Sequence, residues 1–289
     1  MELTIKNERV SVTVSDFGGE LTSLSLDGFE YLWKADPAYF GRVSPILFPI
    51  TGRFMDGYYM HDGRKYELKL NGFAQDGHFE LSKTAENEIT GRLLANDETR
   101  KVYPFDFELT VKYRLTGQML DVTFEVTNRS DEVMPYSVGN HTAYRWPLID
   151  GEEPGSYYLR FEKEEELTSF SPFGWTAPFL CAERVRPIYH SFYENGTRSV
   201  RNPQSDWVEY TGATCDYVVR TYRRELPFIA NWASPKPEAE LVCIEPNLSI
   251  SSHGPTMFDR EGIHSLAPGA TEVTSYQLEV YKKSEKETV

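Results

Sequence analysis

Apolar and polar side chains alternate without a break along two neighbouring stretches of this chain. In the first stretch every second residue is apolar: Phe105, Phe107, Leu109, Val111, Tyr113 and Leu115. After Thr116-Gly117-Gln118 the alternation resumes with Leu120, Val122, Phe124 and Val126. A period of two places the apolar side chains on one face of an extended strand. Two such stretches joined by a short turn containing glycine predict an antiparallel hairpin.

The same period recurs near both ends of the chain. Its apolar positions are Val10, Val12 and Val14, and then Tyr276, Leu278 and Val280. Asp27-Gly28 and Asp62-Gly63 are tight-turn signals between aromatic strand formers. No long stretch keeps the spacing of an amphipathic helix, and 20 glycines and 17 prolines punctuate the chain. We therefore predict an all-β fold, a large antiparallel sandwich of stacked sheets whose long loops carry the functional site.

The length of 289 residues suits one large β domain. No internal repeat and no linker divides the chain, so we predict a single domain over residues 1–289. The acidic run Glu162–Glu166 is expected in a solvated edge or loop. Residues 282–289 are expected to form a frayed tail.

The formal net charge of -14 disfavours two classes of partner. A field of that sign repels phosphate backbones and anionic lipid, so we expect neither nucleic acid nor a membrane surface as a partner. The N-terminal segment Met1–Lys6 has no apolar signal core, and no window approaches a membrane-spanning length. The sequence leaves the oligomeric state open.

The cysteines and histidines predict neither a metal site nor a bound cofactor. Cys181, Cys215 and Cys243 are odd in number, far apart and form no CxxC pair. This pattern argues against a disulfide framework or a zinc site and fits a reducing cytoplasm, where we expect the protein to reside. The histidines lack the spacing of a metal cage, and the chain has no HExxH motif, no glycine-rich phosphate loop and no GxSxG motif.

Glu245 ends an apolar run, Leu241–Ile244, and precedes Pro246. A carboxylate that leaves an apolar strand is costly to desolvate, so it usually has a partner or a task. We expect Pro246 to end the strand pairing, which leaves Glu245 at the mouth of a cleft as a tunable base. The alternative is an ordinary surface glutamate. No second carboxylate is tied to it, so a glycosidase pair is unsupported.

His141 stands among small and amide side chains in Gly139-Asn140-His141-Thr142. It follows a strand-like stretch, and a histidine can donate a proton near neutral pH. Gly139 permits a close backbone approach, and Asn140 could orient a ring or a ligand. The alternative is a structural histidine. Together with Glu245, it suggests an acid and a base that face each other across a cleft.

Two further stretches contain candidate binding residues. Arg53 follows the apolar run Pro45–Ile50, where its guanidinium could donate to ligand hydroxyls or simply face solvent. Asn71–Phe79 reads as a small polar loop with one aromatic residue of the kind that is usually buried. The segment Ser251–Gly254 reads as a loop without a role.

Several motifs in order resemble the aldose 1-epimerase (galactose mutarotase) family, and in particular its LacX-like branch. These motifs are Tyr39–Arg53, Tyr103–Leu109, Gly139–Tyr144, Leu226-Pro227-Phe228 with Trp232, Cys243–Pro246 and Leu266–Gly269. The resemblance spans nearly the whole chain. It implies a galactose mutarotase-like β-supersandwich that holds a monosaccharide in an open cleft without metal or cofactor.

The resemblance also implies roles for individual residues. Glu245 would be the catalytic base and His141 the catalytic acid, and Arg53 would bind the sugar. Glu225 would take the place of a family aspartate that binds sugar hydroxyls. Where the branch usually has His-Gly-Phe-Ala-Arg, this chain has Asn71-Gly72-Phe73-Ala74-Gln75.

Asn71 and Gln75 occupy substrate-binding positions but differ in chemistry from the family residues. Asparagine can bond a hydroxyl but carries no proton or charge near neutral pH. Glutamine cannot form the charged fork that grips a phosphate. His78 could compensate for Asn71 by folding back.

Three functions follow, in order of preference. The first is an isomerase that interconverts the α and β anomers of a free hexose by acid–base ring opening. The second is a carbohydrate-binding protein of the same fold with weak or no turnover, which the changes at Asn71 and Gln75 favour. The third is a hexose-phosphate epimerase, which needs convergent cations such as Arg42 and Arg53 and lacks one at Gln75.

Overall fold

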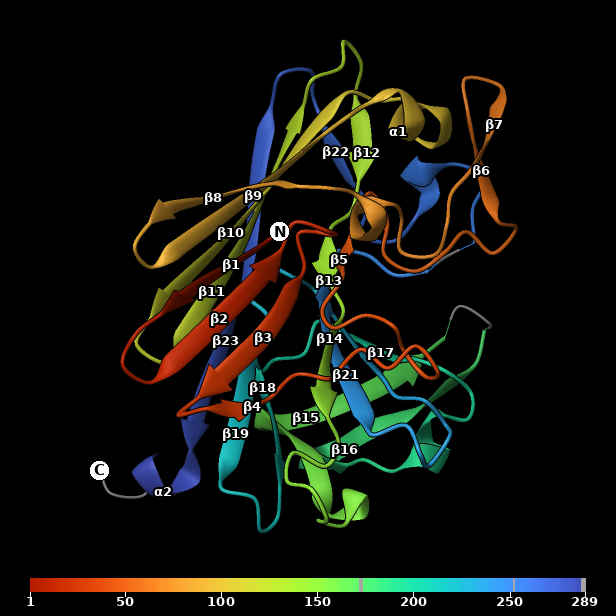
Figure 1. The fold of residues 1–289 in the computed structure, drawn as a ribbon. Coiled ribbons are helices and arrows are strands. Elements are labelled where there is room, and N and C mark those ends of the chain that lie inside the picture. Colours follow the sequence, from red (N-terminus) through yellow and green to blue (C-terminus); the bar gives the residue numbers. More distant parts are fainter. Residues whose placement is uncertain (172–173, 252, 287–289) are drawn as a thin grey trace.

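A computed structural model describes the chain except for residues 172–173, 252 and 287–289, and the described part consists mainly of β strands and loops (Figure 1). The first strands are β1 (Glu2–Lys6), β2 (Val10–Ser15), β3 (Leu21–Leu26), β4 (Phe29–Glu30), β5 (Ile46–Leu47), β6 (Tyr58–His61), β7 (Arg64–Glu67), β8 (Glu80–Ala85), β9 (Glu88–Leu94), β10 (Phe107–Thr116), β11 (Met119–Asn128), β12 (Met134–Tyr136), β13 (Gly139–Asn140) and β14 (Thr142–Arg145). The remaining strands are β15 (Tyr157–Phe170), β16 (Thr176–Pro187), β17 (Arg198–Arg201), β18 (Trp207–Gly212), β19 (Tyr217–Tyr222), β20 (Phe228–Trp232), β21 (Leu241–Asn247), β22 (His264–Leu266) and β23 (Thr271–Lys282).

The described helices are short, which confirms the all-β prediction. They are α1 (Asp97–Val102) and α2 (Lys283–Lys286), together with 3-10 turns at Ala74–Asp76, Pro154–Ser156, His190–Tyr193 and Met257–Asp259. Within the described part of the chain, no helix has the length and apolar character needed to span a bilayer. Residues 282–286 were predicted to belong to a frayed tail, but they are ordered in secondary structure. Lys282 ends β23 and residues 283–286 form α2. Residues 287–289 of that tail lie outside the described residues.

Most strands belong to one antiparallel sheet. Over the described residues its order is β5-β13-β21-β20-β17-β15-β18-β19-β23-β11-β10-β9-β8, with β14 beside β21 and β16 beside β15. Strands β1 to β4 form a separate sheet, and β12 with β22 and β6 with β7 form two-stranded ribbons. The N-terminal sheet lies over the large sheet, where β1 contacts β8 and β9 and β3 contacts β23 (Figure 1). The stacked sheets enclose the apolar core.

The predicted central hairpin is formed by β10 and β11. Its register pairs Leu109 with Val126 and Val111 with Phe124, and all four side chains are buried. Gly117 in the turn has a φ of 59°, in the left-handed region that glycine adopts without strain. The period-two pattern is therefore the buried face of this hairpin.

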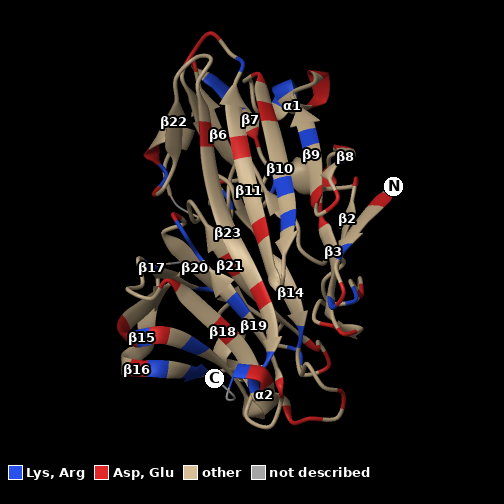
Figure 2. Cartoon of the chain, turned by 90° about the vertical axis from the view of Figure 1, so that its left-hand side faces the viewer, with Lys and Arg blue, Asp and Glu red and all other residues tan. Residues whose placement is uncertain are grey.

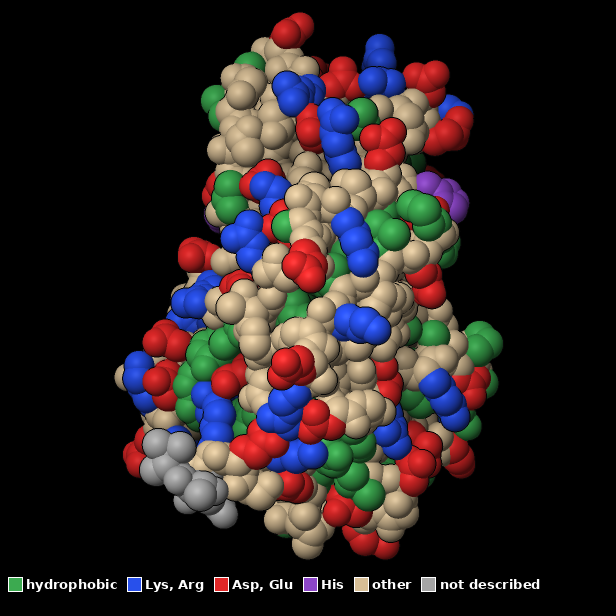
Figure 3. Space-filling view, turned by 60° about the vertical axis from the view of Figure 1, so that its left-hand side comes forward, with side chains coloured by type: hydrophobic (Ala, Val, Ile, Leu, Met, Phe, Trp, Pro, Cys, Tyr) green, Lys and Arg blue, Asp and Glu red, His purple; other side chains and the backbone are tan. Residues whose placement is uncertain are grey.

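The outward face of the large sheet carries charged side chains. Figure 2 shows acidic and basic segments along β9, β10 and β23. Glu108 pairs with Arg92 at 2.8 Å and with Arg129 at 2.6 Å, and Lys112 pairs with Glu125 at 2.5 Å. On the face drawn in Figure 3, acidic and basic side chains are intermixed rather than separated. These pairs lie on the solvated side of the sheet.

The acidic run Glu162–Glu166 was predicted as a solvated edge or loop, but it lies inside β15 and its Glu165 is buried. Glu165 is 2 % exposed, whereas Glu164 and Glu166 are exposed. The Glu165 carboxylate accepts hydrogen bonds from Ser205 N and Ser205 Oγ at 2.6 Å each, and from Gln204 N at 3.2 Å. It is buried because it satisfies the donors of the neighbouring loop.

We predict that Glu165→Ala lowers the free energy of unfolding by about 2–3 kcal/mol, because it leaves these three donors without their acceptor. Urea denaturation at neutral pH measures the change. The exposed neighbours supply the controls, and Glu164→Ala and Glu166→Ala should change stability by about 0.5 kcal/mol or less. An equal effect at all three positions would contradict the role assigned to Glu165.

Candidate functional site

A cavity of about 460 Å³ opens beside strand β21. Its size lies within the range of small-molecule sites. Its described lining combines a few aromatic and apolar side chains with many polar ones: Phe40, Leu47, Thr51, Gly52, Arg53, Leu70, Asn71, Gln75, His141, Ser171, Gly196, Thr197, Ser199, Ala230, Trp232, Glu245, Asn247, Ser249, Ile250 and Ser251. These residues come from distant parts of the sequence, so the cavity exists only in the folded chain.

The register of β21 brings His141 and Glu245 together. Strand β13 pairs Gly139 with Asn247, and β14 pairs Thr142 with Ile244. His141 lies between these two strands and therefore faces Glu245 across the gap. His141 Nε2 is 3.3 Å from Glu245 Oε1, and both residues line the cavity.

Glu245 lies within a strand rather than at its mouth. Pairing with β20 continues past it, since Pro246 lies opposite Ile229 and Asn247 lies opposite Phe228. The expectation that Pro246 ends the pairing is therefore wrong. Burial of Glu245 consequently comes from strands on both sides, and the residue is 5 % exposed.

Aromatic rings surround His141. Phe40 stacks on the imidazole with 5.0 Å between ring centroids, and Trp232 meets it edge-on at 5.9 Å. Trp33 Nε1 donates a hydrogen bond of 2.8 Å to the carbonyl of Phe40, which fixes the loop that carries this ring. The His141 side chain is consequently 12 % exposed and is held away from bulk water.

The Asn140 side chain points to the opposite face of the chain from His141 and binds Ser44 there. Its Oδ1 accepts hydrogen bonds from Ser44 Oγ at 2.7 Å and from Thr142 Oγ1, and its Nδ2 donates to the Ser44 carbonyl at 3.1 Å. Asn140 is fully buried and does not line the cavity. It therefore stabilises the strand that carries His141 and has no contact with the cavity.

Burial shifts the proton affinities of His141 and Glu245 in opposite directions. It raises the pKa of the Glu245 carboxyl to about 8 and lowers the pKa of the His141 imidazole to about 4. Loss of water disfavours the charged form of each group. Between these two pH values the pair holds one proton. Transfer of that proton from carboxyl to imidazole creates a carboxylate and an imidazolium without changing the total charge.

Arg53 is exposed and lines the cavity. Its backbone N–H donates to Ser251 Oγ at 3.0 Å. The preceding Gly52 has a φ of 72°, and a Cβ there would lie 2.0 Å from Ser251 Oγ. Only glycine fits this position, so the loop of Arg53 and the loop of Ser251 close on each other.

A buried arginine ties these two loops together. Arg260 is 3 % exposed and donates to the carbonyls of Thr51 at 2.6 Å, Arg53 at 2.9 Å and Ile250 at 2.9 Å. Its guanidinium stacks on Phe54, 4.6 Å from the ring centroid. Burial lowers the pKa of Arg260 to about 10. The cation is therefore used to hold backbone that forms one wall of the cavity.

Asn71 and Gln75 line the cavity and also hold its loops in place. Asn71 has a φ of 63°, and its Oδ1 accepts from Gly52 N at 2.7 Å. Gln75 Nε2 donates to the carbonyls of Leu70 at 3.1 Å and Gly72 at 3.4 Å. Each amide thus has a role within the protein in addition to its position on the cavity wall.

Three residues suggested by the sequence lie outside the cavity. Glu225 is exposed between β19 and β20 and accepts a hydrogen bond of 3.4 Å from Ser275 Oγ. Arg42 pairs with Asp76 at 2.5 Å, so its charge is already neutralised. His78 is exposed and does not fold back onto Asn71. Glu225, Arg42 and His78 therefore do not line this cavity.

Some cavity residues were not identified from the sequence. Asn247 lies two positions beyond Glu245, and period-two alternation along β21 could have placed it on the same face. Ser251 lines the cavity although the sequence around it predicts only a loop. Thr51, Ser249 and Ser199 carry no local signal at all, because single hydroxyl side chains are common everywhere in a β protein.

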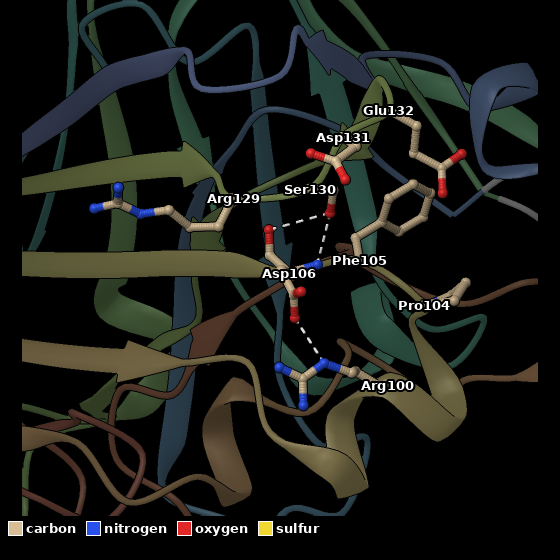
Figure 4. A pocket seen from close by; sticks show the side chains of 8 residues that line it. All are labelled: Arg100, Pro104, Phe105, Asp106, Arg129, Ser130, Asp131 and Glu132. Carbon is tan, nitrogen blue, oxygen red and sulfur yellow. Dashed lines mark hydrogen bonds and ion pairs between the residues drawn. The ribbon is translucent and has the colours of Figure 1, made fainter.

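A smaller cavity of about 330 Å³ lies away from β21 (Figure 4). Its arginines are already paired, since Arg100 donates to Asp106 at 2.6 Å and Arg129 binds Glu108 at 2.6 Å. Next to it, Glu132 lies 3.4 Å from His61 and forms a surface group with Asp62. Neither feature contains a buried polar atom without a partner among the described residues.

Comparison with known proteins gives a consistent result. The model of the family described as aldose 1-epimerase matches residues 1–197. Plasmid-encoded protein LacX of Lactococcus lactis subsp. lactis is 28 % identical over 97 % of this chain and 99 % of its own length. Protein YphB of Escherichia coli K12 is 25 % identical over 96 % and 98 %.

Solved structures match the fold over almost the whole chain. A galactose mutarotase related enzyme from Lactobacillus acidophilus has a TM-score of 0.90 at 28 % identity and covers 97 % of both chains. A galactose mutarotase-like protein from Lactobacillus casei ATCC 334 has a TM-score of 0.89 at 26 % identity, covering 97 % of this chain and all of its own. The galactose mutarotase-like architecture implied by the sequence motifs is thereby confirmed.

We predict that Glu245→Gln becomes more stable relative to wild type as the pH rises from about 5 to 8. The unfolded carboxyl loses its proton near its ordinary pKa of 4.5, whereas the folded carboxyl keeps it up to about 8. Wild type therefore loses stability across this window, and glutamine does not titrate. The difference in free energy of unfolding between Glu245→Gln and wild type should grow by more than about 1 kcal/mol over this pH range. Urea denaturation at several pH values measures it. Glu164→Gln is the exposed control, and a parallel pH profile for Glu245→Gln and wild type would refute the raised pKa.

We also predict that Arg260→Met lowers the free energy of unfolding by about 3 kcal/mol, because three backbone carbonyls lose a charged donor. Arg201→Met is the matched control. Arg201 pairs with Glu261 at the surface, where such a pair contributes about 1 kcal/mol or less. Chemical denaturation measures both. Equal losses in the two variants would show that Arg260 does not hold the cavity loops.

Proposed function

The chain belongs to the aldose 1-epimerase family, and on that basis we propose that it interconverts the α and β anomers of a free hexose. His141 and Glu245 are the proposed catalytic pair. Ring opening and closure require one proton donor and one proton acceptor at the anomeric centre. The reaction requires no redox change and no group transfer to the protein.

The observation that carries this proposal is the 3.3 Å approach of His141 Nε2 to Glu245 Oε1 inside the cavity. The approach does not meet hydrogen-bond geometry, so Glu245 Oε1, like His141 Nδ1, is buried without a hydrogen bond among the described residues. Buried polar atoms without partners are costly, and a bound polar ligand can satisfy such atoms. Both residues line the cavity, so a substrate bound there could supply the missing hydrogen bonds.

The single proton held by the pair supports acid–base chemistry. In the carboxylate–imidazolium form, Glu245 takes the proton of the anomeric hydroxyl and His141 gives its proton to the ring oxygen. The bond between the anomeric carbon and the ring oxygen breaks, and an open-chain aldehyde forms. After rotation about the bond to the next carbon, the ring oxygen attacks the other face and both protons return.

The lining of the cavity favours an uncharged sugar. Arg53 is the one lysine or arginine among the described residues that line it. Arg42, the second cation that a hexose phosphate would need, lies outside and is paired with Asp76. Phe40 and Trp232 offer flat apolar faces of the kind that pack against a sugar ring. A free hexose fits this set of groups better than a phosphorylated one.

A carbohydrate-binding role without turnover is the second candidate. The observation that favours it is the pair of uncharged amides, Asn71 and Gln75, at positions where the resemblance implies histidine and arginine. Both amides hold loop backbone, so they contribute to the shape of the cavity. Sugar binding without faster equilibration of anomers would support this second role.

We predict that Glu245→Gln and His141→Gln each slow the equilibration of fresh α-glucose or α-galactose by about 100- to 10,000-fold, because each removes one of the two proton-handling groups. Polarimetry or NMR follows the anomers. The wild-type rate should fall below about pH 4 and above about pH 8, where the pair no longer holds a single proton.

The uncatalysed rate at each pH is the baseline for these measurements. Glu164→Gln is the control, since Glu164 is exposed in β15 and should keep the wild-type rate. If wild type is no faster than Glu245→Gln over a panel of aldoses, the isomerase proposal fails. Competition by a hexose 6-phosphate but not by the free hexose would instead favour the phosphate substrate.

A further inference from the structure

Asn247 lines the cavity and carries a third buried polar atom without a hydrogen-bond partner among the described residues. The residue is 3 % exposed and lines the cavity together with Glu245. Its Oδ1 is buried and accepts no hydrogen bond within the described part of the chain. A buried acceptor without a donor is unfavourable. A donor brought by a ligand would remove this cost.

Strands β13 and β21 leave space for the Asn247 amide. Asn247 lies opposite Gly139 in the register of β13 with β21. A Cβ at Gly139 would lie 1.9 Å from Asn247 Oδ1 and 3.0 Å from Thr51 Cγ2. Any side chain larger than hydrogen at position 139 would displace the amide. The absence of a Cβ there therefore makes room for Asn247.

The amide lies beside the proposed catalytic pair and on the same face of β21. Residues two apart on a strand point to the same side and are separated by about 6.7 Å along it. Glu245 and Asn247 are two apart. Asn247 pairs with Gly139, and Glu245 Oε1 lies 3.3 Å from His141 Nε2. A ring whose anomeric hydroxyl meets Glu245 can thus bring a neighbouring hydroxyl to Asn247.

Asn247 also places a hydrogen-bond acceptor in a residue that lines the cavity, which Glu225 does not. The resemblance implied a carboxylate acceptor for sugar hydroxyls at Glu225, which lies outside the cavity. Asn71 Oδ1 is already bonded to Gly52 N. Asn247 Oδ1 is therefore a buried acceptor without a protein donor in a residue that lines the cavity, and it is neutral, so it adds no negative charge next to Glu245.

We propose that Asn247 Oδ1 accepts a hydrogen bond from the hydroxyl on the carbon next to the anomeric carbon, and so selects aldoses that carry this 2-hydroxyl. The inference rests on the proposed function, because Glu245 is taken to meet the anomeric hydroxyl. The 2-hydroxyl is the nearest group to it on the side away from the ring oxygen. Asn247 acts as a specificity residue, while the proton transfers belong to His141 and Glu245.

The test compares glucose with 2-deoxyglucose and 6-deoxyglucose in wild type and in Asn247→Leu, which keeps the side-chain size and removes the acceptor. Each rate is corrected for the uncatalysed rate of the same sugar. We expect wild type to lose about tenfold in kcat/KM on 2-deoxyglucose and Asn247→Leu to lose less than about twofold, because the hydrogen bond is already absent. Neither protein should discriminate strongly against 6-deoxyglucose.

Stability separates this role from a structural one. Removing an acceptor that has no partner should leave the free energy of unfolding of Asn247→Leu unchanged or raised. Asn128→Leu is the matched control. Asn128 is fully buried, and its amide bonds Ser130 N, the Glu132 carbonyl and the Leu266 carbonyl, so its loss should destabilise the fold without altering the preference among sugars.

The outcomes separate this inference from the proposed function. If wild type accelerates glucose but wild type and Asn247→Leu lose equally on 2-deoxyglucose, the inference fails and the isomerase survives. If 6-deoxyglucose rather than 2-deoxyglucose shows the Asn247-dependent loss, the assignment to the 2-hydroxyl is overturned. If wild type accelerates no sugar, calorimetry measures the affinities of wild type and Asn247→Leu for glucose and 2-deoxyglucose. Wild type should then prefer glucose more strongly than Asn247→Leu does. Absence of any Asn247-dependent difference there contradicts the inference.

Discussion

The site depends on the register in which β21 pairs with β13 and β14. This register sets His141 opposite Glu245, two residues that the chain separates by about a hundred positions. A slip of one residue would turn His141 toward the other face, where Asn140 and Thr142 are buried. The hydrogen bonds of Asn140 to Ser44 therefore protect the geometry of the site, although Asn140 never meets the cavity.

Desolvation sets the pKa values of His141 and Glu245. Burial raises the pKa of the Glu245 carboxyl and lowers the pKa of the His141 imidazole, because loss of water disfavours the charged form of each group. The cations near the cavity are divided between two tasks. Arg260 is buried and binds backbone carbonyls, while Arg53 stays at the rim where a ligand can reach it. Arg260 thus holds the wall, while Arg53 lies exposed on the cavity lining.

The local pattern predicted the strands and turns well, because a period of two and Asp-Gly pairs act over a few residues. The local pattern gave wrong predictions where the environment of a residue depends on contacts with a segment distant in the sequence. Glu165 reads as part of a solvated acidic run, yet it is buried by the donors of residues 204–205. Pro246 reads as the end of a strand, yet pairing continues through it because β20 supplies the partner residues. In both cases the deciding contact comes from another segment.

The sequence by itself determined an all-β chain and, through its ordered motifs, the family to which it belongs. It also pointed to His141, Glu245 and Arg53, because these residues stand inside those motifs. Only the tertiary structure decided which polar groups share one cavity. It excluded Glu225 and added Asn247, since membership of a cavity depends on strand register and burial between segments far apart in the chain. Periodicity along one strand contains no information about which other strand lies opposite.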